Sequence, residues 1–138
     1  MQAIEMKQGI YWVGVKDWEL REFHGYTTDK GSTYNAYLIV DDKITLIDGV
    51  KAPFRDIFLA RIASVVDPAK IDVVICNHVE MDHSGTLPDI MQVAKNATMY
   101  CPAAGERGLK AHYDTTGWNI KTVKTGDTLS IGKHTLSF

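Results

Sequence analysis

The sequence IDVVICNHVEMDHSG, residues 71–85, joins a short apolar run to a cluster of histidine and carboxylate side chains. Its first six residues are nearly all apolar, as in a strand that is buried on both faces between helical layers. Polar side chains then begin abruptly at the carboxyl end of this predicted strand. Open α/β sheets bind their ligands at that end, because the loops that leave the strands converge there on a crevice.

Four strong metal ligands, His78, Glu80, Asp82 and His83, fall within six residues of this stretch. In extended backbone the first three point to one side, and a turn that begins near Asp82 brings His83 round toward a second ion. Imidazole with carboxylate favours iron, manganese or zinc, and a carboxylate-rich set suits redox iron better than a structural zinc site. The stretch therefore predicts half of a dinuclear metal site. The competing interpretation is a solvated polar loop with incidental histidines.

The rest of the chain predicts an α/β fold with a mixed sheet. The first strands form an antiparallel hairpin, and helices then alternate with strands, which predicts a sheet covered by helices on at least one face. No internal repeat or linker marks a domain boundary. The expected strands are 9–15, 34–40, 43–48, 71–76, 98–101 and 119–123, with a last hairpin from residue 126, and the expected helices are 54–66, 88–95 and 103 to about 112.

The motif resembles that of a known family. The metallo-β-lactamase fold carries HxHxDH in this loop, and the flavodiiron proteins, also called A-type flavoproteins, have Glu in place of the second His, as this chain has at Glu80. The resemblance includes the segments 17–18, 23–26 and 31–39 and spans essentially the whole chain. It implies that residues 1–138 form the N-terminal part of a metallo-β-lactamase-like di-iron domain, the first half of an αβ/βα four-layer sandwich.

The resemblance also implies which residues bind the two irons. His78 and Glu80 would bind one iron, and Asp82 and His83 would bind the other. The family takes further ligands, another His, a bridging Asp and a final His, from the second half of the domain. This chain ends before them, so we expect an incomplete iron site in it. His134 is expected to be an exposed strand residue and not one of those ligands.

Three more residues take roles only through the resemblance. His24 and Tyr26 lie in the family's region that lines the substrate pocket over the metals, although by position alone they are ordinary loop residues. Asp48 closes a predicted strand, and in this fold an acid there supports the metal loop through hydrogen bonds and does not bind metal itself.

The activity implied for the complete enzyme is reduction of oxygen to water, or of nitric oxide to nitrous oxide, at a non-haem di-iron site. Electrons would pass from a rubredoxin-like donor to FMN and then to iron. FMN would bind to a flavodoxin-like domain that this chain lacks, and no glycine-rich loop here would hold it. We expect the isolated chain to be inactive, and we expect its open apolar sheet face to form a homo-oligomer or to bind a complementing fragment.

Two rival interpretations of function stay open. The first is a zinc-dependent hydrolase of the metallo-β-lactamase superfamily, in which a metal-bound hydroxide attacks an ester, amide or thioester. Glu80 in place of His is the feature that separates this rival from an iron oxidoreductase. The second is a catalytically silent half-domain that needs a complementing chain.

Composition limits the remaining classes. The 138 residues are 45% hydrophobic, which is enough apolar material for the core of one domain. The net charge of -2, from 15 basic and 17 acidic residues, does not indicate a basic surface for binding nucleic acid. No apolar stretch approaches the roughly 20 residues of a membrane span, and residues 1–8 lack the apolar block of a leader, so we expect a soluble, cytoplasmic protein. Cys76 and Cys101 lack CxxC spacing and are expected to be buried thiols. His112 is expected to interact with a helix dipole.

Overall fold

The strand that precedes the metal-ligand motif lies inside a seven-stranded sheet. The computed structural model describes residues 1–138, and the order of strands in its main sheet is β1-β2-β7-β8-β9-β10-β11. The motif strand β9 (Val73–Ile75) pairs with β8 (Thr45–Ile47) on one edge and with β10 (Thr98–Cys101) on the other, and its three residues are all buried. The loop of residues 77–85, called the motif loop below, therefore leaves the sheet from an interior strand.

The sheet is mixed because its two halves pair differently. β1 (Ile4–Lys7), β2 (Ile10–Trp12), β7 (Tyr37–Ile39) and β8 pair antiparallel, whereas β8, β9, β10 and β11 (Asn119–Thr122) pair parallel. Parallel neighbours need crossover connections, and helices fill these. The helical segments are η1 (Ala52–Phe54), α1 (Arg55–Ala63), η2 (Pro68–Lys70), α2 (Met81–Ser84), α3 (Leu87–Val93) and α4 (Ala103–His112).

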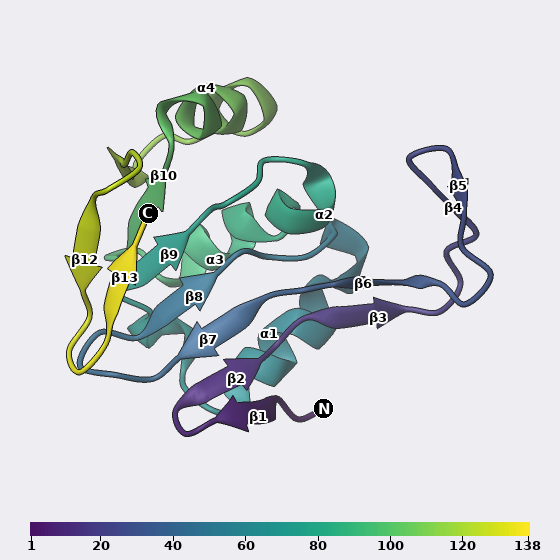
Figure 1. Cartoon of the computed structure of the whole chain (residues 1–138), viewed down its shortest axis with the longest axis horizontal. Coiled ribbons are helices and arrows are strands. Elements are labelled where there is room, and N and C mark those ends of the chain that lie inside the picture. Colours follow the sequence, from purple (N-terminus) through teal and green to yellow (C-terminus); the bar gives the residue numbers. More distant parts are fainter.

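One face of the sheet packs on helices and forms the main core. Leu38, Leu46, Val74 and Met99 are paired in register across β7, β8, β9 and β10, so their side chains share this face. All four are fully buried. Helices α1 and α3 lie behind the sheet in Figure 1, and their buried side chains belong to the same core cluster.

The opposite face of the sheet is covered in part by a hairpin. Strands β12 (Thr128–Ser130) and β13 (Thr135–Ser137) pair antiparallel and lie in front of the sheet in Figure 1. Side chains alternate along β10, so Tyr100 faces away from its core neighbour Met99. The Tyr100 ring stacks on Phe138, with 6.3 Å between ring centroids. Ile131, between the two hairpin strands, is fully buried.

Asp41 fastens this hairpin to the turn between β7 and β8. Its carboxylate accepts hydrogen bonds from the backbone amides of Lys133 at 3.1 Å and His134 at 2.9 Å, and it lies 2.7 Å from His134 Nδ1. The pKa of Asp41 is well below its ordinary value, mainly because of the hydrogen bond from the Lys133 amide. The His134 side chain and the amides of Asp42 and His134 lower it further. We call these contacts the Asp41 clasp.

A two-stranded arm extends from the sheet and carries a small hairpin at its tip. The arm consists of β3 (Val15–Asp17) and β6 (Ser32–Tyr34), and the tip consists of β4 (Glu22–Phe23) and β5 (Tyr26–Thr27) (Figure 1). Gly14 allows the chain to enter the arm, because a Cβ at this position would overlap the carbonyl oxygen of Tyr34. The arm brings residues 22–27 toward the motif loop.

Most of the predicted elements are confirmed. The strand at 98–101 and the helix that ends at His112 are present with these bounds, and α1, α3, β8, β9 and β11 lie within or at the edge of their predicted ranges. The α/β class with a large mixed sheet is confirmed as well. Cys76 and Cys101 are free and buried, as expected. None of the helices combines the length and the apolar character that crossing a membrane requires.

Some sequence-based expectations need correction. The strands expected at 9–15 and 34–40 are each divided in two, because the chain leaves the sheet there to form the arm. The prediction also misses β1 and the β4–β5 hairpin, whose short segments have no buried side chain to give a pattern. The sheet does not lie between two helical layers, since the β12–β13 hairpin lies in front of its second face, where Tyr100 of β10 stacks on Phe138. His134 is exposed as expected, but it lies before β13 and contacts Asp41.

Candidate metal centre

The motif loop leaves β9 in extended conformation and turns into a helix after Glu80. Glu80 has φ -62° and ψ 148°, and the single-turn helix α2 begins at the next residue. Asp82 therefore lies on a helical turn, whereas extended backbone was the expectation for it. The turn expected near Asp82 is present, and it brings His83 round as predicted, because residues of one helical turn project in different directions.

The loop forms two neighbouring pairs of histidine and carboxylate. His78 Nε2 lies 3.4 Å from Glu80 Oε2, and His83 Nε2 lies 3.3 Å from Asp82 Oδ2. The two imidazole rings are edge to face, with 5.3 Å between their centroids. The structure thus brings together the four residues that the motif predicts, in the same two pairs that the family resemblance implies. Their role as metal ligands stays a prediction.

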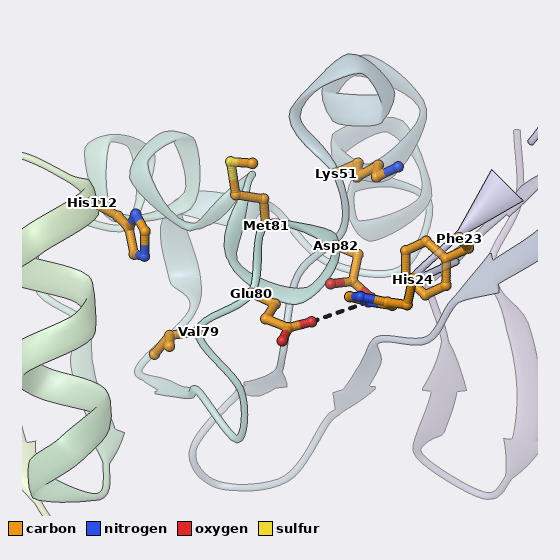
Figure 2. Close-up of a pocket in the computed structure, with 8 residues that line it drawn as sticks. All are labelled: Phe23, His24, Lys51, Val79, Glu80, Met81, Asp82 and His112. Carbon is orange, nitrogen blue, oxygen red and sulfur yellow. Dashed lines mark ion pairs between the residues drawn. The ribbon is translucent and has the colours of Figure 1, made fainter. Parts of the chain in front are cut away.

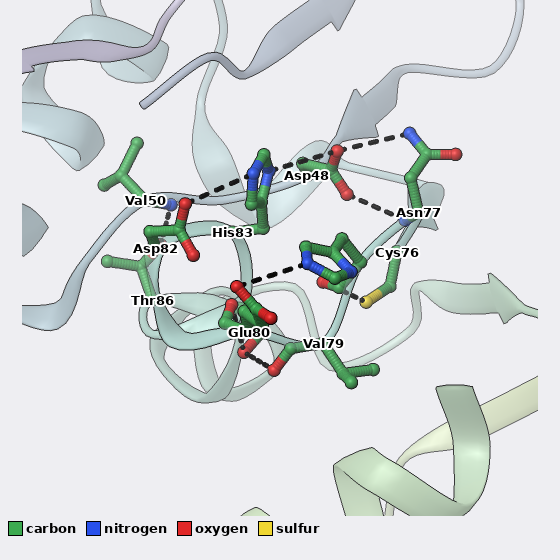
Figure 3. Close-up of polar contacts among 11 residues, drawn as sticks. Asp48, Val50, Cys76, Asn77, Val79, Glu80, Asp82, His83 and Thr86 are labelled. Atoms are coloured by element: carbon green, nitrogen blue, oxygen red, sulfur yellow. Dashed lines mark hydrogen bonds and ion pairs between the residues drawn. The ribbon is translucent and has the colours of Figure 1, made fainter. Parts of the chain in front are cut away.

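Asp48 lies behind His83 and holds the start of the motif loop. Its carboxylate accepts hydrogen bonds from the Asn77 backbone amide at 2.7 Å and from Asn77 Nδ2 at 3.2 Å (Figure 3). Asp48 Oδ2 is also 3.6 Å from His83 Nδ1, which is buried without a hydrogen-bond partner. Burial raises the pKa of Asp48, although the Asn77 hydrogen bonds and the nearby His83 oppose this rise. Its φ of 56° is uncommon for a residue other than glycine.

The loop that follows β8 supports the motif loop through its backbone. The Gly49 amide donates to the His83 carbonyl at 2.7 Å, and the Val50 amide donates to Thr86 Oγ1 at 3.0 Å. Gly85 permits this approach, because a Cβ there would come within 2.7 Å of the Ala52 amide nitrogen. The two loops therefore form one packed unit around His83.

His24 reaches the carboxylates from the tip of the arm. Its Nε2 lies 3.2 Å from Glu80 Oε2, and it forms with Glu80 and Asp82 a set whose ligand atoms all lie within 4.8 Å of one another (Figure 2). The backbone of His24 has φ 50°, and the Phe23 ring packs against the imidazole at 4.1 Å between centroids. Tyr26, by contrast, is 75% exposed and does not line the cavity. The predicted pocket roles of both residues stay untested.

An open cavity of about 290 Å³ lies over these side chains. His112 lines it, so the helix-dipole interpretation of this residue is incomplete: it ends α4 as expected, but it also faces the candidate site. Lys51 lines it too, with Nζ 5.3 Å from the centroid of the Tyr34 ring. Their sequence surroundings carry no signal of a site. The full lining is Phe23, His24, Lys51, Val79, Glu80, Met81, Asp82 and His112.

The donor set fits a pair of hard or borderline metal cations. Every ion pair made by Glu80 and Asp82 is with a histidine, and no lysine or arginine neutralises them. Two adjacent carboxylates repel each other, and a bound cation would remove this repulsion. The nearby Cys76 thiol is not part of the set, because its Sγ donates to the His78 carbonyl at 3.3 Å. Nitrogen and oxygen donors without thiolate suit iron, manganese or zinc.

Comparisons with known proteins find relatives of this sequence. The family model described as ODP family beta lactamase matches residues 33–138. The nitric oxide reductase of Moorella thermoacetica is 45% identical over 139 residues, which cover 99% of this chain and 35% of the relative. The rubredoxin-oxygen oxidoreductase of Megalodesulfovibrio gigas is 42% identical, over 100% of this chain and 35% of the relative.

A solved structure gives the same result for the fold. The flavodiiron protein from Giardia intestinalis matches with a TM-score of 0.94 and 44% identity, over 99% of this chain and 34% of that protein. The chain spans 35% of the length of the Moorella thermoacetica relative and of the Megalodesulfovibrio gigas relative.

Proposed function

Because the chain belongs to the ODP family of beta-lactamase domains and has the fold of flavodiiron proteins, we propose that it supplies the metal-binding loop of a flavodiiron oxidoreductase. The proposed activity of the whole enzyme is reduction of oxygen to water, of nitric oxide to nitrous oxide, or of both. The names of the relatives, a nitric oxide reductase and a rubredoxin-oxygen oxidoreductase, support it. Residues 1–138 would be the N-terminal part of the di-iron domain.

The observation that carries this proposal is the pairing within the motif loop. His78 with Glu80 would hold one iron and Asp82 with His83 the other, since the nitrogen and oxygen atoms of each pair lie within 3.4 Å of each other. Glu80 provides an anionic donor, which stabilises oxidised iron better than a neutral imidazole does. Asp48 would keep His83 Nδ1 protonated and leave Nε2 free to bind metal, as carboxylates behind metal-binding histidines commonly do.

Other residues of the chain would orient the substrate. His24 lies next to Glu80 at the cavity and offers a ring N–H to a small oxygen-containing ligand, while Phe23 fixes the ring in place. Lys51 adds a positive charge to the same wall. When bound, the two irons would supply the electrons for reduction of the substrate. We further propose that FMN outside this chain delivers those electrons and that a rubredoxin-type protein donates them, consistent with the relative named rubredoxin-oxygen oxidoreductase.

Metal binding tests the site directly. Anaerobic titration of the chain with Fe²⁺ or Co²⁺ should show weak binding, because the motif supplies about two protein ligands per ion. Glu80→Gln keeps the shape of the side chain and removes its charge. It should weaken metal binding at least about tenfold, because loss of a residue that only supports a metal ligand already costs about tenfold to 100-fold in affinity. Glu106→Gln, which removes the same charge on α4, serves as the control. Equal affinity in both variants would refute the assignment of Glu80.

A chimera tests the reaction. Residues 1–138 would replace the matching segment of the Moorella thermoacetica nitric oxide reductase. We expect the chimera to consume nitric oxide or oxygen when supplied with reduced electron donor, and Glu80→His in it to lose this activity and favour zinc. A chimera that holds two irons and reduces neither gas would contradict the proposal. Zinc-dependent ester or amide hydrolysis by the same protein would instead support the hydrolase alternative.

A further inference from the structure

Helix α4 contacts the motif loop from the side opposite to the arm. The helix packs on β10 and β11, and its Gly108 faces the Val79 side chain so closely that a Cβ there would come within 3.0 Å of Val79 Cγ2. Tyr113 follows the last residue of this helix, and its backbone amide bonds to the Leu109 carbonyl at 2.8 Å. The Tyr113 side chain is half-buried against the core.

The Tyr113 hydroxyl ends on a buried serine inside the motif loop. Tyr113 OH lies 2.9 Å from Ser84 Oγ, and Ser84 is fully buried on α2. Ser84 Oγ also lies 2.8 Å from the Val79 carbonyl and 3.1 Å from the Glu80 carbonyl. Ser84 thus connects Tyr113, at the end of α4, with Val79 and Glu80, the two residues that precede α2.

The chemistry of these atoms sets the direction of the hydrogen bonds. Carbonyl oxygens only accept, so Ser84 uses its single hydrogen on one of them. The Glu80 carbonyl already accepts from the His83 and Ser84 amides, each at 2.9 Å, whereas no backbone amide reaches the Val79 carbonyl. Ser84 therefore donates to Val79, and Tyr113 donates its hydroxyl hydrogen to Ser84.

We propose that Tyr113 is a positioning residue for Glu80, acting through Ser84 and the Val79 carbonyl. The Val79 carbonyl and the Glu80 amide belong to one planar peptide unit, so a hydrogen bond to that carbonyl fixes the rotation of the plane from which Glu80 projects. Glu80 is half exposed and has no cation other than histidine to hold it. The chain Tyr113, Ser84, Val79 would determine where its carboxylate lies before metal arrives. The assignment of Glu80 as a ligand rests on the proposed function.

Two variants, each lacking one hydroxyl, test the proposal. Tyr113→Phe and Ser84→Ala should each lower Co²⁺ affinity about tenfold to 100-fold, as loss of partners behind metal ligands does. The double variant should be no weaker than Ser84→Ala alone, because both substitutions break one chain of bonds. Tyr100→Phe removes a hydroxyl from another half-buried tyrosine that makes no hydrogen bond to the loop, and it is the matched control.

The readouts separate positioning from simple stability. In the metal-free chain, hydrogen exchange at the His83 and Ser84 amides should accelerate in Tyr113→Phe and stay unchanged in Tyr100→Phe, because both amides bond to the Glu80 carbonyl. The Co²⁺ absorption spectrum should also change in Tyr113→Phe, which a purely structural loss would not cause. Affinity within twofold of the parent together with unchanged exchange would overturn the proposal. A parent chain that binds no metal would refute the proposed metal-binding role of the motif loop, and the exchange rates would still decide the role of Tyr113.

Discussion

Replacement of Thr86 by valine should destabilise the fold although the two side chains have nearly the same shape. Thr86 is fully buried, and its Oγ1 accepts the Val50 amide at 3.0 Å. Val50 is also fully buried, so no water can replace the lost acceptor. Thr86 precedes α3, but its side chain makes no capping hydrogen bond to this helix. The substitution therefore removes the hydrogen bond to Val50 and leaves the start of α3 unchanged.

The size of the effect follows from these contacts. A buried amide left without a partner costs about 1–3 kcal/mol, and the methyl group that replaces the hydroxyl returns at most about 0.8 kcal/mol on burial. We expect a net loss of about 1–2 kcal/mol in the free energy of unfolding. With a denaturant slope of about 2 kcal/mol per molar urea, the unfolding midpoint should fall by about 0.5–1 M.

Equilibrium unfolding in urea, followed by circular dichroism, measures this shift. Thr86→Ser is the control, because it keeps the acceptor and loses only a methyl group, worth about 0.8 kcal/mol. The valine variant should therefore unfold at lower urea than the smaller serine variant. A valine variant as stable as the serine variant, or more stable, would show that the Val50 amide finds another partner and would refute the reasoning.

Three further predictions concern packing, pH and reactivity. Gly85→Ala should destabilise the chain in urea by more than 2 kcal/mol or prevent folding, because its Cβ would meet backbone atoms, whereas Gly105→Ala, whose nearest contacts are 3.3 Å, should change stability by less than about 1 kcal/mol. The lowered pKa of Asp41 stabilises the fold at pH values above 3.8, the ordinary pKa of the group, and this stabilisation is lost as the pH falls toward the folded-state pKa. Asp41→Asn should therefore show a smaller drop in urea midpoint between pH 5 and pH 3 than the parent, and an equal drop would argue against the Asp41 clasp. Cys76 and Cys101 are buried and should resist a disulfide reagent at pH 8 until urea unfolds the chain, and rapid labelling of the native chain would contradict this. Burial raises the pKa of Cys101 from 9.0 to about 11, so its contribution to the free energy of unfolding is present below pH 9 and is lost as the pH rises toward 11.

The sequence predicted the parts of this fold that have a strong periodic or apolar signal. The strand at 98–101 and the helix that follows Pro102 are bounded by residues that start and stop such elements, and the structure has them at those positions. The motif was informative for the same reason, because six residues of one loop contain four side chains of types that bind metal. Local spacing therefore predicted that the four side chains gather in one loop, and the family resemblance added their division into two histidine–carboxylate pairs.

The rest of the site depends on contacts between distant segments. His24 is 56 residues before Glu80, and Tyr113 is 29 residues after Ser84, and neither position has a local pattern that marks it. The arm that carries His24 is built from strands of two or three residues, too short for alternation to be recognised. His112 looked like an ordinary helix end because only the tertiary fold places α4 beside the cavity.

The Asp41 clasp has a consequence for the order in which the chain folds. It joins residues 93 positions apart, and closing a loop of that length costs about 4 kcal/mol of chain entropy. Strands β8, β9, β10 and β11, in contrast, each pair with the next strand along the chain, so this part of the sheet can grow by stepwise addition during synthesis. We therefore expect the motif loop to reach its folded arrangement before the β12–β13 hairpin docks. Until it docks, the second face of the sheet is open, and a nascent chain is most exposed to association with its neighbours in that interval.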